Sequence, residues 1–211
     1  VNNTFLPRLS FTSEKLVLLM EGFSPLFVDF NALELQKRRD GGKKQGLVRA
    51  CKPQKGVRIL DATAGWGRDA GVLAGFGAEV TMVERHPVMA ALLADGLSRL
   101  PAESSLVMKV VNMDAKAYLQ ALNPDDYPDV IYIDPMHPIR QKSALVKKDT
   151  QALQQVIGTD NDAADLIQIA RARAKQRVVV KWPQRLAPLF PPTSKIEGKT
   201  VRFDVYAIPK R

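Results

Sequence analysis

The stretch "LDATAGWGRDAG" at residues 60–71 decides the fold. It completes a short β-branched run at 57–62, turns through Gly65 and Gly67, and continues into a pattern typical of a helix over 67–77. A strand that leads through a glycine turn into a helix offers free backbone N–H groups to a bound ligand. Two glycines in a turn are common, so the stretch predicts a ligand site without naming the ligand.

The alternation of strand and helix continues along the chain. We expect further strands at 79–84, 105–111, 129–134 and 177–182, and helices at 87–100, 114–122, 142–157 and 162–174. The residues Glu197-Gly198-Lys199 are typical of a hairpin turn near the C-terminus. This pattern predicts an α/β fold whose mostly parallel, seven-stranded sheet is covered by helices on both faces and ends in an antiparallel hairpin.

The first 50 residues lack this alternation. We predict that residues 1–50 form a small N-terminal subdomain in front of the main domain at 51–211. The subdomain is expected to contain a strand at 26–30 and a basic, glycine-containing loop at 36–44.

Composition narrows the setting in which the protein works. The chain has 211 residues, a formal net charge of +9 and one cysteine, Cys51. A single cysteine fits a reducing compartment, no apolar run approaches the roughly 20 residues that cross a bilayer, and the first residues lack the pattern of a signal peptide. We therefore expect a cytoplasmic protein, and we further expect a monomer that holds no metal.

Positive charge gathers in three runs, at 36–44, 140–148 and 171–177. Such runs favour a polyanionic partner such as a nucleic acid, although each run can also be a solvated helix face. The candidates for contacts with RNA are Lys37, Arg38, Arg39, Lys43, Lys44, Arg140, Lys142, Lys147 and Lys148.

Acidic residues follow the predicted strands, where open α/β sheets bind their ligands. Asp61 ends the first strand, and Glu84 ends the second, where a carboxylate can accept from both hydroxyls of a ribose. Asp114 follows the third strand and can accept from the amine of an adenine, with Met113 packed beside the base. The alternatives are a surface carboxylate for Glu84 and a helix N-cap for Asp114.

The motif "DPMHP" at 134–138 follows the fourth strand and is the most informative one. Its prolines fix the backbone and remove N–H donors, so that a carboxylate and carbonyls line the turn. A site made of acceptors suits a donor such as the exocyclic amine of a base, and His137 is suited to stack on that base. The alternative is a rigid turn in which Asp134 only caps the backbone.

In order and spacing, these motifs resemble class I S-adenosylmethionine (SAM)-dependent methyltransferases. "DPMHP" is similar to the (Asp/Asn)-Pro-Pro-(aromatic) motif of enzymes that methylate the exocyclic amines of bases. The blocks "FVDF", "DATAGWGRDA", "ERHPVMAALLADGL", "DPMHPIRQKSALVKK", "RVVVKWP" and "RFDVYA" resemble the RsmJ (YhiQ) family over roughly residues 20–208. That resemblance implies methylation of a guanine N2 in small-subunit (16S) rRNA, as free rRNA or within the small ribosomal subunit.

The resemblance also implies roles for individual residues. Asp134, Pro135 and His137 are the implied catalytic residues; His137 stands where the wider class has an aromatic residue. Arg68 is expected to neutralise the carboxylate of SAM, while Asp69 faces its ammonium or sulfonium side. The full set of implied cofactor contacts is Asp61, Gly65, Gly67, Arg68, Asp69, Glu84, Arg85, Met113, Asp114 and Asp134.

The expected mechanism is one of positioning. Asp134 and the Pro135 carbonyl accept from the two N–H groups of the guanine amine, and the base leaves its stack to lie on His137 or Trp66. Three rivals remain. One is a nicotinamide-dependent oxidoreductase, one is a methyltransferase that acts on DNA adenine, RNA adenine or a protein amine, and one is an RNA-binding module without catalysis.

Overall fold

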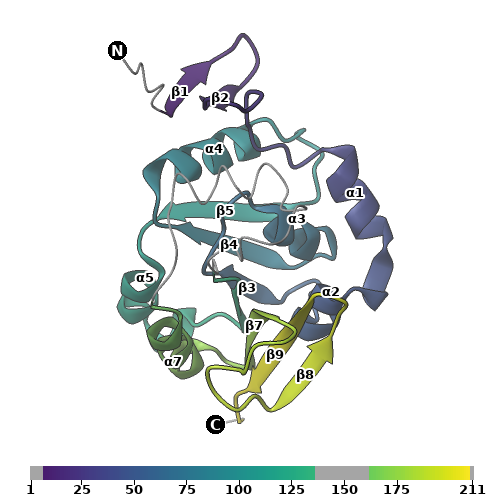
Figure 1. The fold of residues 1–211 in the computed structure, drawn as a ribbon, viewed down its shortest axis with the longest axis vertical. Coiled ribbons are helices and arrows are strands. Elements are labelled where there is room, and N and C mark those ends of the chain that lie inside the picture. The colour runs from purple at the N-terminus through teal and green to yellow at the C-terminus, as the bar shows by residue number, and fades with distance from the viewer. Residues whose placement is uncertain (1–6, 136–161, 210–211) are drawn as a thin grey trace.

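The computed structural model describes residues 7–135 and 162–209. At its centre lies a seven-stranded sheet with the strand order β5-β4-β3-β6-β7-β9-β8 (Figure 1). Strands β3 to β7 run parallel, and β9 runs antiparallel to both β7 and β8. The bounds are Arg58–Asp61 for β3, Glu79–Glu84 for β4, Val107–Asn112 for β5, Val130–Ile133 for β6, Arg177–Pro183 for β7, Ser194–Glu197 for β8 and Val201–Ala207 for β9. The predicted sheet and hairpin are confirmed.

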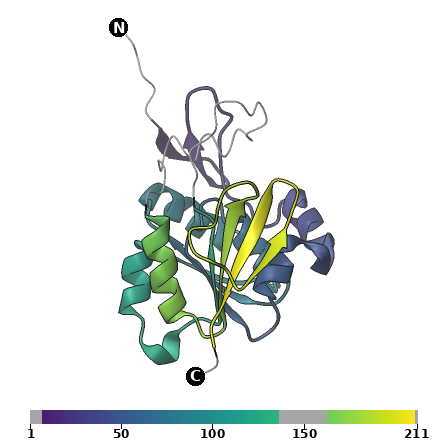
Figure 2. The same ribbon diagram turned by 60° about the horizontal axis from the view of Figure 1, so that its bottom comes forward.

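Helices cover both faces of this sheet (Figures 1 and 2). Leu47, Val72 and Leu92 from α2, α3 and α4 share one apolar cluster, whereas Leu119 and Ile167 from α5 and α7 belong to a second cluster. The bounds are Leu33–Asp40 for α1, Gly46–Cys51 for α2, Arg68–Gly75 for α3, Pro87–Ser98 for α4, Ala115–Ala121 for α5 and Ala163–Arg173 for α7. The helix predicted at 142–157 lies outside the described residues.

The strands contribute side chains to both apolar clusters, because successive side chains of a strand point to opposite faces of the sheet. On β3, Ile59 joins the cluster of α3 and Leu60 joins the cluster of α5 and α7. On β6, Tyr132 and Ile133 divide in the same way. Strands buried on both sides explain the near-continuous apolar runs of the sequence. None of the described helices is long and apolar enough to cross a membrane.

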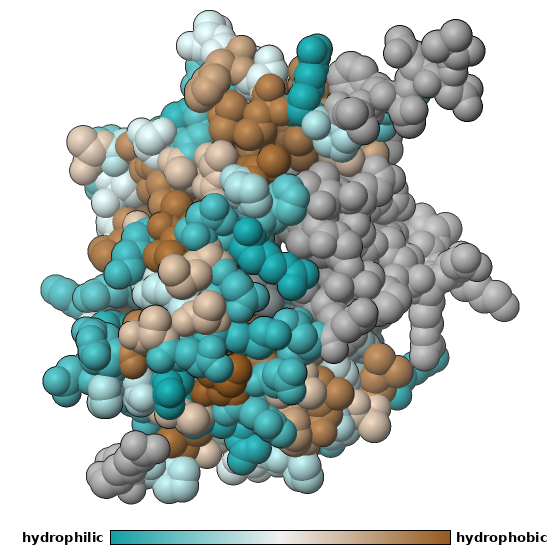
Figure 3. All heavy atoms as spheres, turned by 90° about the vertical axis from the view of Figure 1, so that its left-hand side faces the viewer, coloured by the Kyte–Doolittle hydropathy of each residue, from teal (hydrophilic) through white to brown (hydrophobic). Residues whose placement is uncertain are grey.

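A short antiparallel hairpin stands above α4 at the N-terminal end (Figure 1). Its strands are β1, Arg8–Phe11, and β2, Leu16–Leu19. The Leu16 N–H donates to Asp95 Oδ1 of α4 at 3.1 Å, which ties the hairpin to the sheet domain. Leu9, Phe11 and Phe27 stay exposed in this segment. Figure 3 shows apolar side chains gathered at this end of the molecule.

The strand predicted at 26–30 is wrong. Only Leu26 pairs, in an isolated bridge with Leu18. Val28 and Phe30 instead bury their side chains in the cluster of α3 and α4. A Cβ on Gly96 of α4 would lie 2.6 Å from Val28 Cγ1, so this glycine permits the close approach. The apolar pattern of the segment therefore reflects burial against a helix rather than pairing in a sheet.

The basic loop predicted at 36–44 is also wrong, because most of it is helical. Residues 36–40 belong to α1, and Gly42–Lys44 forms a 3-10 helix. The long unbranched residues of this segment favour a helix, and Leu35 anchors α1 by packing in the cluster of α3. The division of the chain after residue 50 stays a prediction.

Candidate active site

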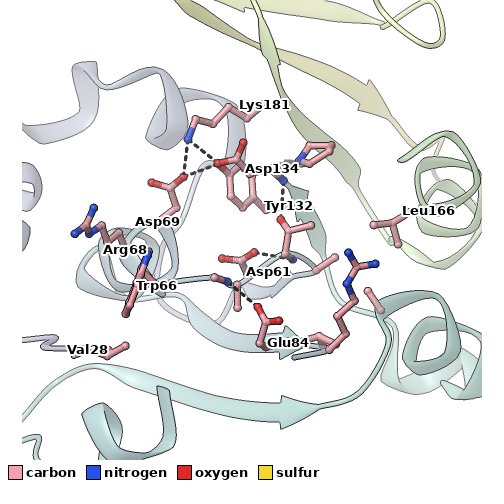
Figure 4. A pocket seen from close by; sticks show the side chains of 18 of the residues that line it. Val28, Asp61, Trp66, Arg68, Asp69, Glu84, Tyr132, Asp134, Leu166 and Lys181 are labelled. Atoms are coloured by element: carbon pink, nitrogen blue, oxygen red, sulfur yellow. Dashed lines mark hydrogen bonds and ion pairs between the residues drawn. The ribbon is translucent and has the colours of Figure 1, made fainter. Parts of the chain in front are cut away.

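A cavity of about 780 Å³ lies beyond the carboxyl ends of β3, β4, β6 and β7. The chain crosses the sheet between β5 and β6, so the cavity lies at the switch point where open α/β sheets bind ligands. Figure 4 shows the labelled side chains that converge there. Asp61, Glu84, Asp134 and Lys181, one from each of these strands or the residue just after it, all line the wall.

The turn after β3 forms the floor of the cavity. Gly65 and Gly67 adopt φ values of +51° and +69°, in the left-handed region that residues other than glycine disfavour. Gly67 also caps the start of α3. These φ values fit the predicted role of the two glycines in shaping this loop, and Gly67 itself is not among the described residues that line the cavity.

Two buried carboxylates hold this turn. Glu84 is 5% exposed and accepts from the Gly65 N–H at 3.0 Å and the His86 N–H at 2.8 Å. Asp61 is 1% exposed and accepts from the Thr63 N–H at 3.1 Å. Burial raises the pKa of Glu84, and burial raises the pKa of Asp61 to about 8. The alternative that Glu84 is a surface carboxylate is wrong.

A network of charges joins α1, α3, β6 and β7. Lys181 Nζ lies 2.7 Å from Asp134 Oδ2 and 3.4 Å from Asp69 Oδ2 (Figure 4). Arg38 Nη2 donates to Asp69 Oδ1 at 2.7 Å, and the Tyr132 hydroxyl donates to Asp69 Oδ2 at 2.6 Å. Lys181 therefore bridges the two carboxylates, and Arg38 is a second cation on Asp69.

The network shifts the pKa values of its members. Burial would raise the pKa of Asp69, but the charges of Lys181 and Arg38 hold it at about 2. Burial raises the pKa of Asp134, and the nearby Lys181 opposes that shift. The Asp69 and Asp134 carboxylates outweigh the burial of Lys181 and raise its pKa. Lys181 is therefore an ammonium ion at any physiological pH.

The "DPMHP" turn begins at the end of β6. The Asp134 N–H donates to Thr63 Oγ1 at 2.7 Å, which ties this turn to the floor after β3. Asp134 and Pro135 both line the cavity. His137 lies outside the described residues, as do Arg140, Lys142, Lys147 and Lys148.

The third strand supplies Asp114, which does cap a helix. Its Oδ1 accepts from the N–H groups of Lys116 and Ala117 at 3.0 and 3.1 Å, at the start of α5. Asp114 also lines the cavity, so both readings of this residue remain compatible. Met113 is 43% exposed and is not among the described residues that form the wall.

The basic candidates fall into separate places. Arg38, Arg68 and Arg85 line the cavity. Lys37 and Lys44 are exposed on α1 and the 3-10 helix. For Arg39 and Lys43 only the backbone is described.

Sequence reasoning missed Lys181, Tyr132 and the inward contact of Arg38. The signal for Lys181 was present, because a lysine interrupts the apolar run "RVVVKW". Tyr132 has the same kind of signal, since its hydroxyl needs a partner when the ring is buried in a strand. The partner of Arg38 lies 31 residues away, and no local pattern identifies it.

The residues present fit SAM. Its ammonium and sulfonium are cations, and Asp61, Asp69 and Asp134 bring carboxylates to one wall. Glu84 stands at the end of β4, where a carboxylate can accept from a ribose, and Trp66 adds an aromatic surface. Among residues 7–135 and 162–209, no group of three or more His, Cys, Asp or Glu side chains could hold a metal ion.

Solved structures share this fold. A crystal structure of a SAM-dependent methyltransferase from Neisseria gonorrhoeae is 31% identical, with a TM-score of 0.70, and the match covers 92% of this chain and 79% of that one. A Thermus thermophilus 16S rRNA N2 G1207 methyltransferase, solved with AdoMet and guanosine, is 21% identical with a TM-score of 0.54. That match covers 97% of this chain and 50% of the other, and it is a likeness of fold alone.

A family model described as "Putative SAM-dependent methyltransferase" matches residues 2–208, and with the fold and cavity it defines a SAM-dependent methyltransferase. Ribosomal RNA small subunit methyltransferase J of Legionella pneumophila (strain Lens) is 59% identical over 197 residues, covering 92% of this chain and 81% of its own. The protein of the same name from Coxiella burnetii (strain Dugway 5J108-111) is 47% identical over 193 residues, covering 87% and 75%. The chain belongs to the ribosomal RNA small subunit methyltransferase J family.

Proposed function

We propose that this enzyme transfers a methyl group to the exocyclic N2 of a guanine in small-subunit rRNA. The observation that carries the proposal is the position of Asp134. This residue directly follows β6, precedes Pro135 and lines the same cavity as Asp61 and Glu84. The names of the relatives from Legionella and Coxiella support small-subunit rRNA as the substrate. The Thermus enzyme of similar fold, named for N2 of a guanine in 16S rRNA, is compatible with the guanine amine.

The chain holds the cofactor through the acidic wall and the turn after β3. Glu84 takes the ribose hydroxyls, Asp114 takes the adenine amine, and Arg68 neutralises the carboxylate of the amino-acid end. Asp69 and Asp134 provide negative charge beside the ammonium and the sulfonium, and Asp61 adds a carboxyl group to the same wall. When bound, SAM supplies a methyl group on a positively charged sulfur, which departs as a neutral thioether.

Asp134 acts on the target amine. The lone pair of a guanine N2 is delocalised into the ring, so the amine is a weak nucleophile. A carboxylate oxygen of Asp134 and the Pro135 carbonyl accept from its two N–H groups and direct the lone pair at the methyl carbon. The same carboxylate stabilises the positive charge that develops on nitrogen and accepts the proton that leaves once the N–C bond has formed.

The proposed contacts with RNA come from basic residues of α1, of the 3-10 helix and of the segment 140–148. Lys37 and Lys44 are exposed beside the cavity-lining Arg38, which suits contacts with phosphates. Arg39, Lys43 and the residues Arg140, Lys142, Lys147 and Lys148 complete the proposed footprint, and residues 1–50 form the proposed RNA-binding subdomain. Because its substrate is ribosomal, the enzyme works in the cytoplasm, and it works as a monomer.

The test is to map the methylated atom. The enzyme is incubated with SAM carrying a labelled methyl group and with either naked small-subunit rRNA or assembled small subunits from cells that lack the enzyme. Nuclease digestion and mass spectrometry of the nucleosides are expected to give labelled N2-methylguanosine at a single position. Label in N6-methyladenosine, or no label in either substrate, would contradict the proposal.

A further inference from the structure

We propose that Lys181 is a positioning residue for this reaction: its ammonium holds the Asp134 carboxylate ionised and fixes its orientation toward the target amine. The inference rests on the proposed function, in which Asp134 accepts from that amine. It concerns a residue that no sequence motif of the site includes.

The register of the sheet brings the two residues together. Strands β6 and β7 pair in parallel, with Tyr132 beside Val179 and Ile133 beside Val180. One residue further along both strands, Asp134 comes beside Lys181, on the face of the sheet that also carries Tyr132. Backbone pairing thus sets the contact of 2.7 Å between Lys181 Nζ and Asp134 Oδ2. The contact therefore does not depend on a flexible loop.

Lys181 is the cation that Asp134 depends on. Asp69 has closer donors than Lys181. It accepts from Arg38 at 2.7 Å and from Tyr132 at 2.6 Å, whereas Lys181 Nζ lies 3.4 Å from its Oδ2. Among the described residues, Lys181 is the only side chain paired with the Asp134 carboxylate. The pairing uses Oδ2, so we assign Oδ1 as the oxygen that accepts from the target amine.

The surroundings of Asp134 make this cation necessary. Asp69 of α3 is a like charge, the burial of Asp61 at the end of β3 raises the pKa of that carboxyl to about 8, and the Tyr132 hydroxyl already donates to Asp69. Arg38 of α1 is the other cation that acts on Asp134. Without Lys181, burial and the neighbouring carboxylates would favour the protonated form of Asp134. A protonated Asp134 has no negative charge to stabilise the positive charge that develops on the amine, and it is no longer a base for the departing proton.

Lys181 works through its charge rather than as a base. The two carboxylates keep it protonated, so it has no lone pair with which to take the amine proton. Its ammonium pairs with Asp134 Oδ2, and in the proposed role it orients this acceptor without entering the reaction.

The experiment compares Lys181→Met, Lys181→Arg and wild type. We expect kcat of Lys181→Met to fall by about ten- to a hundredfold at pH 7. We also expect the acid limb of its kcat–pH profile to move up by about one to three pH units, because a nearby opposite charge lowers a carboxyl pKa by that much. The loss shrinks at pH 9, where Asp134 ionises without help. Lys181→Arg keeps the cation and restores most of the rate and the wild-type pH profile.

The matched control is Lys195→Met, which removes the same charge from an exposed position on β8 of the same sheet. It is expected to leave the kcat profile unchanged. A raised KM for RNA in Lys181→Met with kcat and its pH profile unchanged would overturn the inference and assign Lys181 to RNA binding. A pH-independent loss that Lys181→Arg does not restore would also overturn it.

A second measurement does not depend on the substrate. The carboxyl carbon of Asp134 is titrated by NMR in protein carrying ¹³C-labelled aspartate, with Asp134→Asn to assign the signal. A higher midpoint in Lys181→Met than in wild type supports the inference even where the methylated atom is not a guanine N2, and equal midpoints refute it. Failure of the proposed function is thus distinguishable from failure of the role of Lys181.

Discussion

At the residue scale, the carboxylates of the cavity differ in charge because their surroundings differ. Asp61 is buried, no cation of the described residues pairs with it, and burial raises its pKa to about 8. Asp69 is partly buried, which would raise its pKa, yet two cations hold that pKa at about 2. The same chemical group is therefore mostly neutral at one position and always ionised at another, within a single cavity.

The shift of Asp61 predicts how stability depends on pH. Between the ordinary pKa of 3.8 and about 8, the folded state keeps a proton that the unfolded state has lost, so the free energy of unfolding falls as the pH rises through this window. Asp61→Asn keeps the acceptor for Thr63 but cannot ionise. In the absence of cofactor, we expect the free energy of unfolding of Asp61→Asn to rise by about 1–4 kcal/mol relative to that of wild type between pH 5 and pH 8.

Urea unfolding at the two pH values measures this difference. Asp125→Asn, at an exposed position, serves as the control and should follow wild type. If Asp61→Asn lost as much stability as wild type between pH 5 and pH 8, Asp61 would already be ionised in the folded protein.

Residues of the site could be predicted from the sequence where a strand ends. Asp61, Glu84 and Asp134 follow apolar runs, and in a parallel sheet such ends meet at one edge, which makes their convergence predictable. Lys181 lies within a strand, and its partner is fixed by register. Register is set by pairing between distant segments, so the contact could not be predicted from local pattern.

At the element scale, helix starts gave the clearest predictions. Pro87 opens α4 and Asp114 caps α5, as their sequence positions indicate. The segment 26–30 failed because an apolar run of five residues fits a strand and a buried connection equally well. Gly67, Gly71 of α3 and Gly96 of α4 are distant in sequence from this segment, and they leave the space that Val28 and Phe30 occupy.

The two roles of Asp114 can be separated by substitution. Asp114→Ala removes the cap of α5 and is expected to lower the free energy of unfolding by about 1 kcal/mol, whereas Asp114→Asn keeps a capping oxygen and changes it little. Chemical denaturation measures this difference. Calorimetric titration with SAM then tests contact with the cofactor, since both variants should bind SAM more weakly if Asp114 accepts from the adenine amine. If both variants bound SAM as tightly as wild type, capping α5 would be the only role left for Asp114.

At the scale of the whole molecule, the fold is a device for bringing strand ends together. The alternating pattern predicted the sheet, its hairpin and the two helical layers, since strands such as β3, β6 and β7 are short, largely apolar runs separated by helical segments. The placement of residues 7–50 could not be predicted in the same way. Their apolar positions pack against α3 and α4, and nothing in their own periodicity names those partners.

The central claim is that Asp134 accepts from the amine that is methylated. The most direct test is the single-turnover rate of methyl transfer to small-subunit rRNA by Asp134→Asn, with saturating SAM and with SAM affinity measured on the same protein. We predict a rate about 10²–10³-fold below wild type, the usual loss for one stabilising group at a reacting centre, with SAM still bound. A rate close to wild type in the folded, SAM-bound variant would contradict the account.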